Sequence, residues 1–322
     1  MRYLLILFSL LLVITSFAAA PVAGFQVDSY LDTWHDAKRD RDVPVKIYYP
    51  TDKNATCAVI IFSHGLGGSR DGYEYLGKEW ASRGYISVHL THIGSDTSVW
   101  KGKKLLEIKP AMDKAAVNPT NAINRPLDIT FAIDTLFKIN RGEIKGILRG
   151  RIDESKIGVA GHSFGSFTAL AAAGIKLAGR KSFGDDRVKA VIAMSSPVTG
   201  TKDQWDDVYG NVKIPVMHMT GTKDSSNIGK GTKAEDRRIP YDHIKGVDQY
   251  LITFIGGDHM IFSGRKAGDP TREDAKYQQY IKSASDLYWD AYLMGNADAM
   301  KKLKNGSLEK SLKGIANFEM KS

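Results

Sequence analysis

The feature that most constrains this chain is a Gly-x-Ser-x-Gly motif centred on Ser163, at residues 161–165. A short apolar run, residues 157–160, precedes the motif, and an alanine-rich run with good helix propensity, residues 166–173, follows it. When Gly-x-Ser-x-Gly follows a strand and precedes a helix, the motif places a serine nucleophile on a tight turn. The two glycines leave room for that turn, and the free N–H groups that begin the helix face the place where an oxyanion would form. A bare match also arises by chance in glycine-rich connections, so the flanking signals and the downstream residues carry the prediction.

Apolar runs elsewhere in the chain predict further strands. Residues 57–62 are continuously apolar, which is typical of a strand that is buried on both faces of a sheet. Other strands are expected at residues 26–31, 43–49, 85–90, 188–194, 214–220 and 249–255. Helical spacing lies between them, at residues 71–83 and 125–139. This alternation predicts an α/β fold with a mainly parallel sheet of about eight strands and helices on both faces.

Two regions depart from the alternation. Residues 91–122 contain Gly94, Gly102, Pro110 and Pro119, so an irregular insertion is expected there. Residues 271–322 are expected to be helical, with breaks at Gly295 and Gly306. Residues 25–322 are therefore predicted to form a single domain that carries one insertion.

Residues 1–24 resemble a secretory signal peptide. Arg2 provides the positive start, residues 4–17 form the apolar run, and residues 18–20 are small alanines suited to cleavage. An uncleaved N-terminal anchor is the alternative, because residues 4–20 are nearly long enough to span a bilayer. The expected location is secreted or periplasmic. Cys57, the one cysteine, lies in an apolar run, so it is predicted to be a buried packing residue without an internal disulfide.

The net charge of +9 falls only to +8 without the first 24 residues. Such a surplus fits a solvated surface or anionic partners, and no nucleic-acid-binding motif accompanies it. The chain is accordingly predicted to act without nucleic acid.

A serine hydroxyl needs a base, and the base needs an acid that orients it. In a parallel α/β sheet, active residues follow the carboxyl ends of strands. Asp224 follows the strand at 214–220, and His259 follows the strand at 249–255. The chain order Ser163, Asp224, His259 is that of α/β-hydrolases. Asp258 adjoins His259 but should diverge from it, while Asp206 and Asp207 remain as alternative acids.

An oxyanion hole needs two backbone N–H groups, one of them from the residue after the nucleophile, Phe164. The glycine-rich turn at residues 63–68 follows an early strand, and Leu66 is the donor expected there. The remaining histidines are predicted to be structural or surface residues: His64, His89, His92, His162, His218 and His243. For His64 in particular, a hydrogen bond that braces its loop is expected.

The chain resembles α/β-hydrolases over residues 43–293. Within them it is most similar to secreted esterases related to platelet-activating-factor acetylhydrolase and dienelactone hydrolase. The residues that carry the resemblance are 45–50, His64-Gly65-Leu66-Gly67-Gly68, Arg125-Pro126-Leu127-Asp128-Ile129 and residues 161–165. The resemblance implies ester hydrolysis through an acyl-enzyme, without metal or organic cofactor. Bacterial cutinases and polyester hydrolases are also similar, but they usually have a C-terminal disulfide and Gly-His-Ser-Met-Gly-Gly, both missing from this sequence.

The sequence thus predicts an exported serine carboxylic-ester hydrolase with Ser163 as nucleophile, His259 as base and Asp224 as acid. Leu66 and Phe164 would supply the oxyanion hole. Short acyl chains are expected, because no large helical cap domain is apparent. The alternatives are a polyester or lipid hydrolase, a serine peptidase and a non-catalytic binding protein of the same fold. The substrate is expected to be a small-molecule, lipid or polymer ester, contact with a membrane surface stays open, and a monomer is favoured.

Overall fold

The structure is a computed structural model that describes residues 24–53, 55–177, 181–264 and 274–322. The predicted signal peptide therefore lies outside the described residues, except for Gly24. None of the helices within the described ranges combines the length and the apolar character that a bilayer-spanning segment needs.

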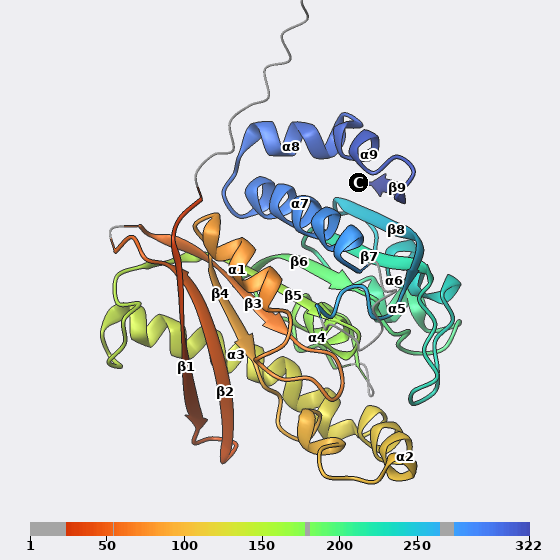
Figure 1. Cartoon of the computed structure of the whole chain (residues 1–322), viewed down its shortest axis with the longest axis horizontal. Coiled ribbons are helices and arrows are strands. Elements are labelled where there is room, and N and C mark those ends of the chain that lie inside the picture. The colour runs from red at the N-terminus through yellow and green to blue at the C-terminus, as the bar shows by residue number, and fades with distance from the viewer. Residues whose placement is uncertain (1–23, 54, 178–180, 265–273) are drawn as a thin grey trace, which may run out of the picture.

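A nine-stranded sheet runs through the described part of the chain, in the order β1-β2-β4-β3-β5-β6-β7-β8-β9 (Figure 1). The strands are β1 (Val27–Asp36), β2 (Arg41–Pro50), β3 (Cys57–Ser63), β4 (Ile86–Leu90), β5 (Ile152–His162), β6 (Val188–Met194), β7 (Val216–Lys223), β8 (Gln249–Asp258) and β9 (Ala316–Lys321). The central pairs from β4 to β8 are parallel, whereas β1, β2 and β9 pair antiparallel with their neighbours. The predicted α/β-hydrolase fold is confirmed.

Helices cover both faces of this sheet (Figure 1). They are α1 (Glu74–Ser82), α2 (Leu105–Ala116), α3 (Pro119–Arg141), α4 (Phe164–Ala172), α5 (Trp205–Tyr209), α6 (Ile239–His243), α7 (Asp274–Tyr292), α8 (Ala297–Lys304) and α9 (Ser307–Ser311), with short 3-10 segments η1 (Thr97–Val99) and η3 (Glu235–Arg238). Helices α3 and α4 pack on one face of the sheet, and α1 and α7 pack on the other.

Strand β3 shows why the middle of the sheet is stable. Its odd-numbered apolar side chains, from Cys57 to Ile61, join the core under α3 and α4. Its even-numbered side chains, from Ala58 to Phe62, join the core under α1 and α7. Successive side chains of a strand point to opposite faces, so a continuous apolar run fills both cores. The prediction from residues 57–62 is confirmed, and the buried, unpaired Cys57 agrees with the packing role expected for it.

Two secondary-structure predictions were wrong. Residues 91–122 are not irregular, since they contain η1, α2 and the first turn of α3. Pro119 begins α3 instead of ending an element, because a first helical residue needs no N–H donor, and the side chain of Asn118 caps that end by accepting a bond from the N–H of Thr120 (2.9 Å). Pro110 lies inside α2 at an exposed position, where the helical bond it removes, to the carbonyl of the highly exposed Leu106, is the least costly.

The C-terminal region is the second correction. Residues 316–321 were expected to be helical, yet they form β9, which pairs antiparallel with β8 at the edge of the sheet. An edge strand of six residues has little periodicity of its own. Its conformation is set by the hydrogen bonds that β8 offers, which a local pattern does not reveal.

Candidate active site

Ser163 lies on the sharp turn between β5 and α4. Its backbone has φ +56° and ψ −120°, a conformation that L-residues adopt only under strain. A Cβ atom on Gly161 would lie 2.1 Å from the carbonyl oxygen of Gly165, and a Cβ on Gly165 would lie 1.8 Å from the carbonyl oxygen of Ser63. Both positions therefore require glycine, which is the physical reason for the motif.

The side chains of Ser163, His259 and Asp224 form a hydrogen-bonded series. The Oγ atom of Ser163 lies 3.0 Å from Nε2 of His259, and Nδ1 of His259 lies 2.7 Å from Oδ1 of Asp224. A carboxylate only accepts, so Nδ1 carries the proton and Nε2 is free to accept the serine proton. The three residues follow the carboxyl ends of β5, β8 and β7, and the structure brings together the side chains selected by that rule.

The other candidate acids lie elsewhere. Asp258 turns back into its own loop, where its Oδ1 accepts from the N–H of Met260 at 2.8 Å. Asp206 and Asp207 lie on α5 and pair with His243 and Lys176, respectively. The described contacts thus place Asp224 alone of these four carboxylates against the imidazole of His259.

Asp224 is fully buried, and hydrogen-bond donors surround both of its carboxylate oxygens. Its Oδ2 accepts from the hydroxyls of Ser195 (2.5 Å) and Thr220 (2.8 Å), and Nε of Arg237 lies 3.3 Å from its Oδ1. Burial raises the pKa of Asp224, but the hydrogen bond from His259 and the charge of Arg237 outweigh it, and the pKa is lowered overall. The carboxylate therefore stays ionised, as an acceptor that orients an imidazole must.

Arg237, from η3, is the residue of this site that the sequence prediction missed most completely. It donates to the carbonyl oxygens of Asp224 (3.1 Å) and Ser195 (3.0 Å), and its side chain is 1% exposed. One of its terminal nitrogens lies 3.4 Å from Nδ1 of His259. The guanidinium thus ties together the loops after β6 and β7. Nothing in its local sequence signals this role, whereas Ser195 and Thr220 could have been found because they lie at strand ends.

His162 points away from Ser163, as expected, but it does more than fill space. Its Nε2 lies 2.9 Å from the carbonyl oxygen of His259 and its Nδ1 lies 2.8 Å from the hydroxyl of Tyr73. The carbonyl can only accept, so Nε2 carries the proton and Tyr73 donates to Nδ1. The same hydroxyl accepts from the N–H of Gly65 at 3.3 Å. Burial lowers the pKa of His162 well below its ordinary value, so a neutral ring links the loop of His259 to the glycine-rich turn.

That turn contains Leu66. The N–H of Gly68 donates to the carbonyl of Gly65 (3.0 Å), and Gly67 has a positive φ of +72°, which a glycine adopts without strain. His64 braces the turn, as predicted, through a 2.6 Å bond from its Nδ1 to the carbonyl of Gly65. Leu66 lines the same cavity as Ser163 and Phe164. Phe164 is the first residue of α4, where an N–H has no acceptor within the helix.

Arg125 lies beneath both expected oxyanion donors. It is fully buried and donates to the hydroxyls of Thr168 (2.7 Å), Ser95 (2.8 Å) and Ser63 (2.9 Å) and to the carbonyl oxygen of His64. Burial lowers its pKa to about 9, so it remains a cation at neutral pH.

The guanidinium of Arg125 also lies 4.6 Å from the ring centre of Phe164. It therefore contacts both segments that carry the expected oxyanion donors, the glycine-rich turn and the start of α4. The sequence singled out Arg125 only as part of a resemblance, and the structure gives it these contacts.

A second buried carboxylate extends this network. Asp128 accepts from Nδ1 of His92 at 2.8 Å and from Nε of Arg41 at 2.9 Å, and Nε2 of His92 lies 2.9 Å from the hydroxyl of Ser63. Burial raises the pKa of Asp128, but these hydrogen bonds lower it to about 2 overall. The motif at 125–129 thus places one buried cation and one buried anion behind the glycine-rich turn.

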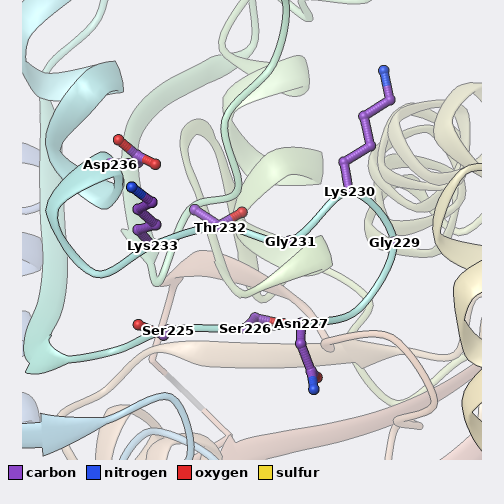
Figure 2. A pocket seen from close by; sticks show the side chains of 9 residues that line it. All are labelled: Ser225, Ser226, Asn227, Gly229, Lys230, Gly231, Thr232, Lys233 and Asp236. Atoms are coloured by element: carbon purple, nitrogen blue, oxygen red, sulfur yellow. The ribbon is translucent and has the colours of Figure 1, made fainter.

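The cavity in front of Ser163 has a volume of about 320 Å³. Its apolar lining includes Leu66, Phe164, Phe167, Pro197, Val198 and Ile228. One wall is the loop 225–233, which also borders a second hollow of about 900 Å³ (Figure 2). In Figure 2 Lys233 lies beside Asp236 at one end of this loop, and Lys230 projects from its far bend. No group of three or more His, Cys, Asp or Glu side chains within the described ranges could hold a metal ion.

Comparison with known proteins points to the same fold. The family model described as platelet-activating factor acetylhydrolase, isoform II, matches residues 40–109, a region that includes the turn with Leu66 and ends before Ser163. A platelet-activating factor acetylhydrolase of Canis lupus familiaris is 33% identical over 236 residues, 64% of this chain and 48% of that protein. The chain has an α/β-hydrolase fold and is similar to these acetylhydrolases. The predicted resemblance is confirmed.

Two further relatives carry the same name. The protein of Cavia porcellus is 29% identical over 152 residues, 40% of this chain and 34% of its own length. The protein of Bos taurus is 24% identical over 194 residues, 51% of this chain and 40% of its own length. The matched regions thus span about half or less of each relative.

Proposed function

We propose that this chain is a serine carboxylic-ester hydrolase that acts through an acyl-enzyme. The observation that carries the proposal is the hydrogen-bonded series Ser163–His259–Asp224, whose serine lies on a strained turn and lines a cavity of about 320 Å³. Similarity to proteins named acetylhydrolases supports the reaction class.

The reaction proceeds in two displacements. His259 takes the proton from Ser163 as its Oγ attacks the ester carbonyl, and the negative oxygen that forms is held by the N–H groups of Leu66 and Phe164. The protonated His259 then gives its proton to the departing alcohol, which leaves an acyl group on Ser163. A water molecule, activated in the same way, releases the acid and restores the serine. Asp224 orients the imidazole and stabilises its charge throughout.

The acyl group is proposed to be short. The cavity is small and largely apolar, with Phe167, Pro197 and Val198 in its wall. Relatives named for removal of an acetyl group from platelet-activating factor support a short acyl chain and a lipid alcohol. A lipid ester is therefore favoured over a polymer or a peptide.

The test uses p-nitrophenyl esters of increasing acyl length with wild type and two serine variants. Ser163→Ala should lower kcat by a factor of about 10⁴ or more, because it removes the nucleophile. Ser225→Ala, a control on the exposed rim loop of the cavity, should stay within about twofold of wild type. Acetate and butyrate should exceed dodecanoate in kcat/KM. A Ser163→Ala variant that keeps a tenth of the wild-type turnover would refute the nucleophile, and a preference for dodecanoate would refute the short pocket.

Export is proposed from residues 1–24, whose charge and apolar pattern suit a signal peptide. The intact mass of protein recovered outside the cytoplasm of a bacterial host should correspond to an N-terminus between residues 19 and 25. A membrane-bound product that begins at Met1 would favour an anchor instead.

A further inference from the structure

The start of helix α2 exposes two adjacent leucines. Leu105 is 84% exposed and Leu106 is 89% exposed, whereas the next most exposed large apolar side chain in the described ranges, Val117, reaches 57%. Scattered apolar side chains on a surface need no explanation, but two adjacent and nearly fully exposed leucines do. Water is a poor solvent for both, so this tip of the molecule is suited to an apolar partner.

Basic side chains surround the leucines. Lys101, Lys103 and Lys104 precede them, are exposed, and form no ion pair within the described ranges. The nearest acid, Glu107, is engaged in capping α2 through a 3.0 Å bond from the N–H of Lys104. We call residues 101–106 the basic-leucine tip. It combines a small apolar centre with three unpaired positive charges.

The tip is held in a fixed relation to the active site. At the other end of α2, Ala116 and Val117 line the cavity that contains Ser163. The indole N–H of Trp100, next to the tip, donates to the carbonyl of Gly67 at 2.7 Å. In Figure 1 α2 lies at the periphery of the molecule, beyond the sheet. Eleven helical steps from Leu105 to Ala116 place the tip about 16 Å from the cavity wall.

We propose that the basic-leucine tip docks the enzyme on an anionic lipid surface, beside which the cavity receives its ester. This deepens the proposed function by naming the surface from which the substrate is drawn. Leucines that enter the interface and lysines that face anionic headgroups contribute together to such binding. A second copy of the chain is a poor occupant, because it would bring like charges against Lys101, Lys103 and Lys104. A neutral apolar groove of another protein would leave the same charges unmatched.

Vesicle binding tests the proposal without catalysis when it is measured in the Ser163→Ala background. Vesicles of phosphatidylcholine and phosphatidylglycerol in equal parts should bind the protein more tightly than pure phosphatidylcholine, and high salt should reduce the difference. Adding Leu105→Ser and Leu106→Ser should raise the Kd for the mixed vesicles at least about tenfold.

Two further variants sharpen the test. The matched control carries Ile144→Ser and Ile147→Ser, two exposed isoleucines in the loop after α3, and should bind mixed vesicles like the parent. A triple change of Lys101, Lys103 and Lys104 to Gln should remove the preference for anionic vesicles, a change of about tenfold or more.

The outcomes are distinguishable from failure of the proposed function. With Ser163 intact, the double leucine variant should keep its kcat/KM for a soluble acetate ester within about twofold. Absence of vesicle binding, or equal losses in the leucine variant and the isoleucine control, overturns the docking surface even if the esterase is active. A leucine variant that binds vesicles normally but turns a dimer into a monomer in solution also overturns it, since the tip would then serve a second copy.

Discussion

Replacement of Arg125 by Met tests whether a fully buried guanidinium positions the oxyanion donors. The variant loses hydrogen bonds to three hydroxyls and to the carbonyl of His64. The hydroxyls keep other partners, since those of Thr168 and Ser95 donate to backbone carbonyls at 2.9 and 3.2 Å. The carbonyl of His64 loses a charged donor in the protein interior, at a cost of about 1–3 kcal/mol. The methionine also removes a buried charge, so the net loss of stability should stay near the lower end of that range.

The effect on activity should be larger. The methionine has no guanidinium, so the variant loses the contacts that Arg125 makes with the ring of Phe164 and with the turn that carries Leu66. Misplacement of a positioned group by about 1 Å can lower the rate about 10²-fold. We therefore expect kcat for a soluble acetate ester to fall about 10²-fold and KM to change little. Thermal melting should show that the variant is folded. Arg125→Lys should recover only part of the loss, because one ammonium cannot serve acceptors in four directions.

Arg151 provides the matched control. It is 6% exposed and donates to the carbonyls of Pro50 (2.6 Å) and Asp52 (2.7 Å), away from the cavity. Arg151→Met should lower Tm by an amount similar to Arg125→Met and leave kcat within about twofold. Equal losses of kcat in the two variants, or an Arg125→Met enzyme with kcat within threefold of wild type, would refute the positioning role.

Further predictions concern the buried acids and the cysteine. Asp224→Asn should lower kcat about 10⁴-fold, and Asp258→Asn at most about tenfold; kinetics under identical conditions check this, and the reverse order would assign the acid role to Asp258. Asp128 has its pKa lowered to about 2, because hydrogen bonds from its buried partners outweigh burial, which raises it. Its ionised form stabilises the fold above the unfolded pKa of about 4, and this stability is lost as pH falls through 2. Urea unfolding of wild type and Asp128→Asn between pH 6 and 2 should show the steeper loss in wild type, and parallel curves would contradict it. The thiol of Cys57 is buried and its pKa is raised by burial, so a disulfide reagent should modify it only as fast as the protein unfolds, and rapid labelling of native protein would contradict the structure.

The parts that could be predicted from sequence are those fixed by local chemistry. Residues 57–62 are apolar without interruption, and such a run is stable only between two helical layers. The turn at Ser163 excludes side chains at Gly161 and Gly165, so the motif itself carries the steric requirement. The rule that active residues follow the carboxyl ends of parallel strands then selected Asp224 and His259.

The missed features depend on contacts between distant residues. Arg237 has no periodic or motif signal, and its place beside Asp224 results from how η3 packs under the loops after β6 and β7. The bond between Tyr73 and His162 joins residues 89 positions apart. Helix α2 was missed because its proline suggested a break, although the exposed position of Pro110 makes the lost bond tolerable. In each case the local sequence is compatible with several structures, and tertiary packing selects one.

The central claim is that the hydroxyl of Ser163, activated by His259 and Asp224, is the nucleophile that forms the acyl-enzyme. Labelling with a fluorophosphonate, followed by peptide mass mapping, tests it most directly, because the reagent reacts with an activated serine whatever the natural ester is. We expect one adduct per chain on the peptide that contains Ser163, no adduct in Ser163→Ala, and labelling slowed by several orders of magnitude in His259→Ala. An adduct on another residue, or undiminished labelling of Ser163→Ala, would contradict the account.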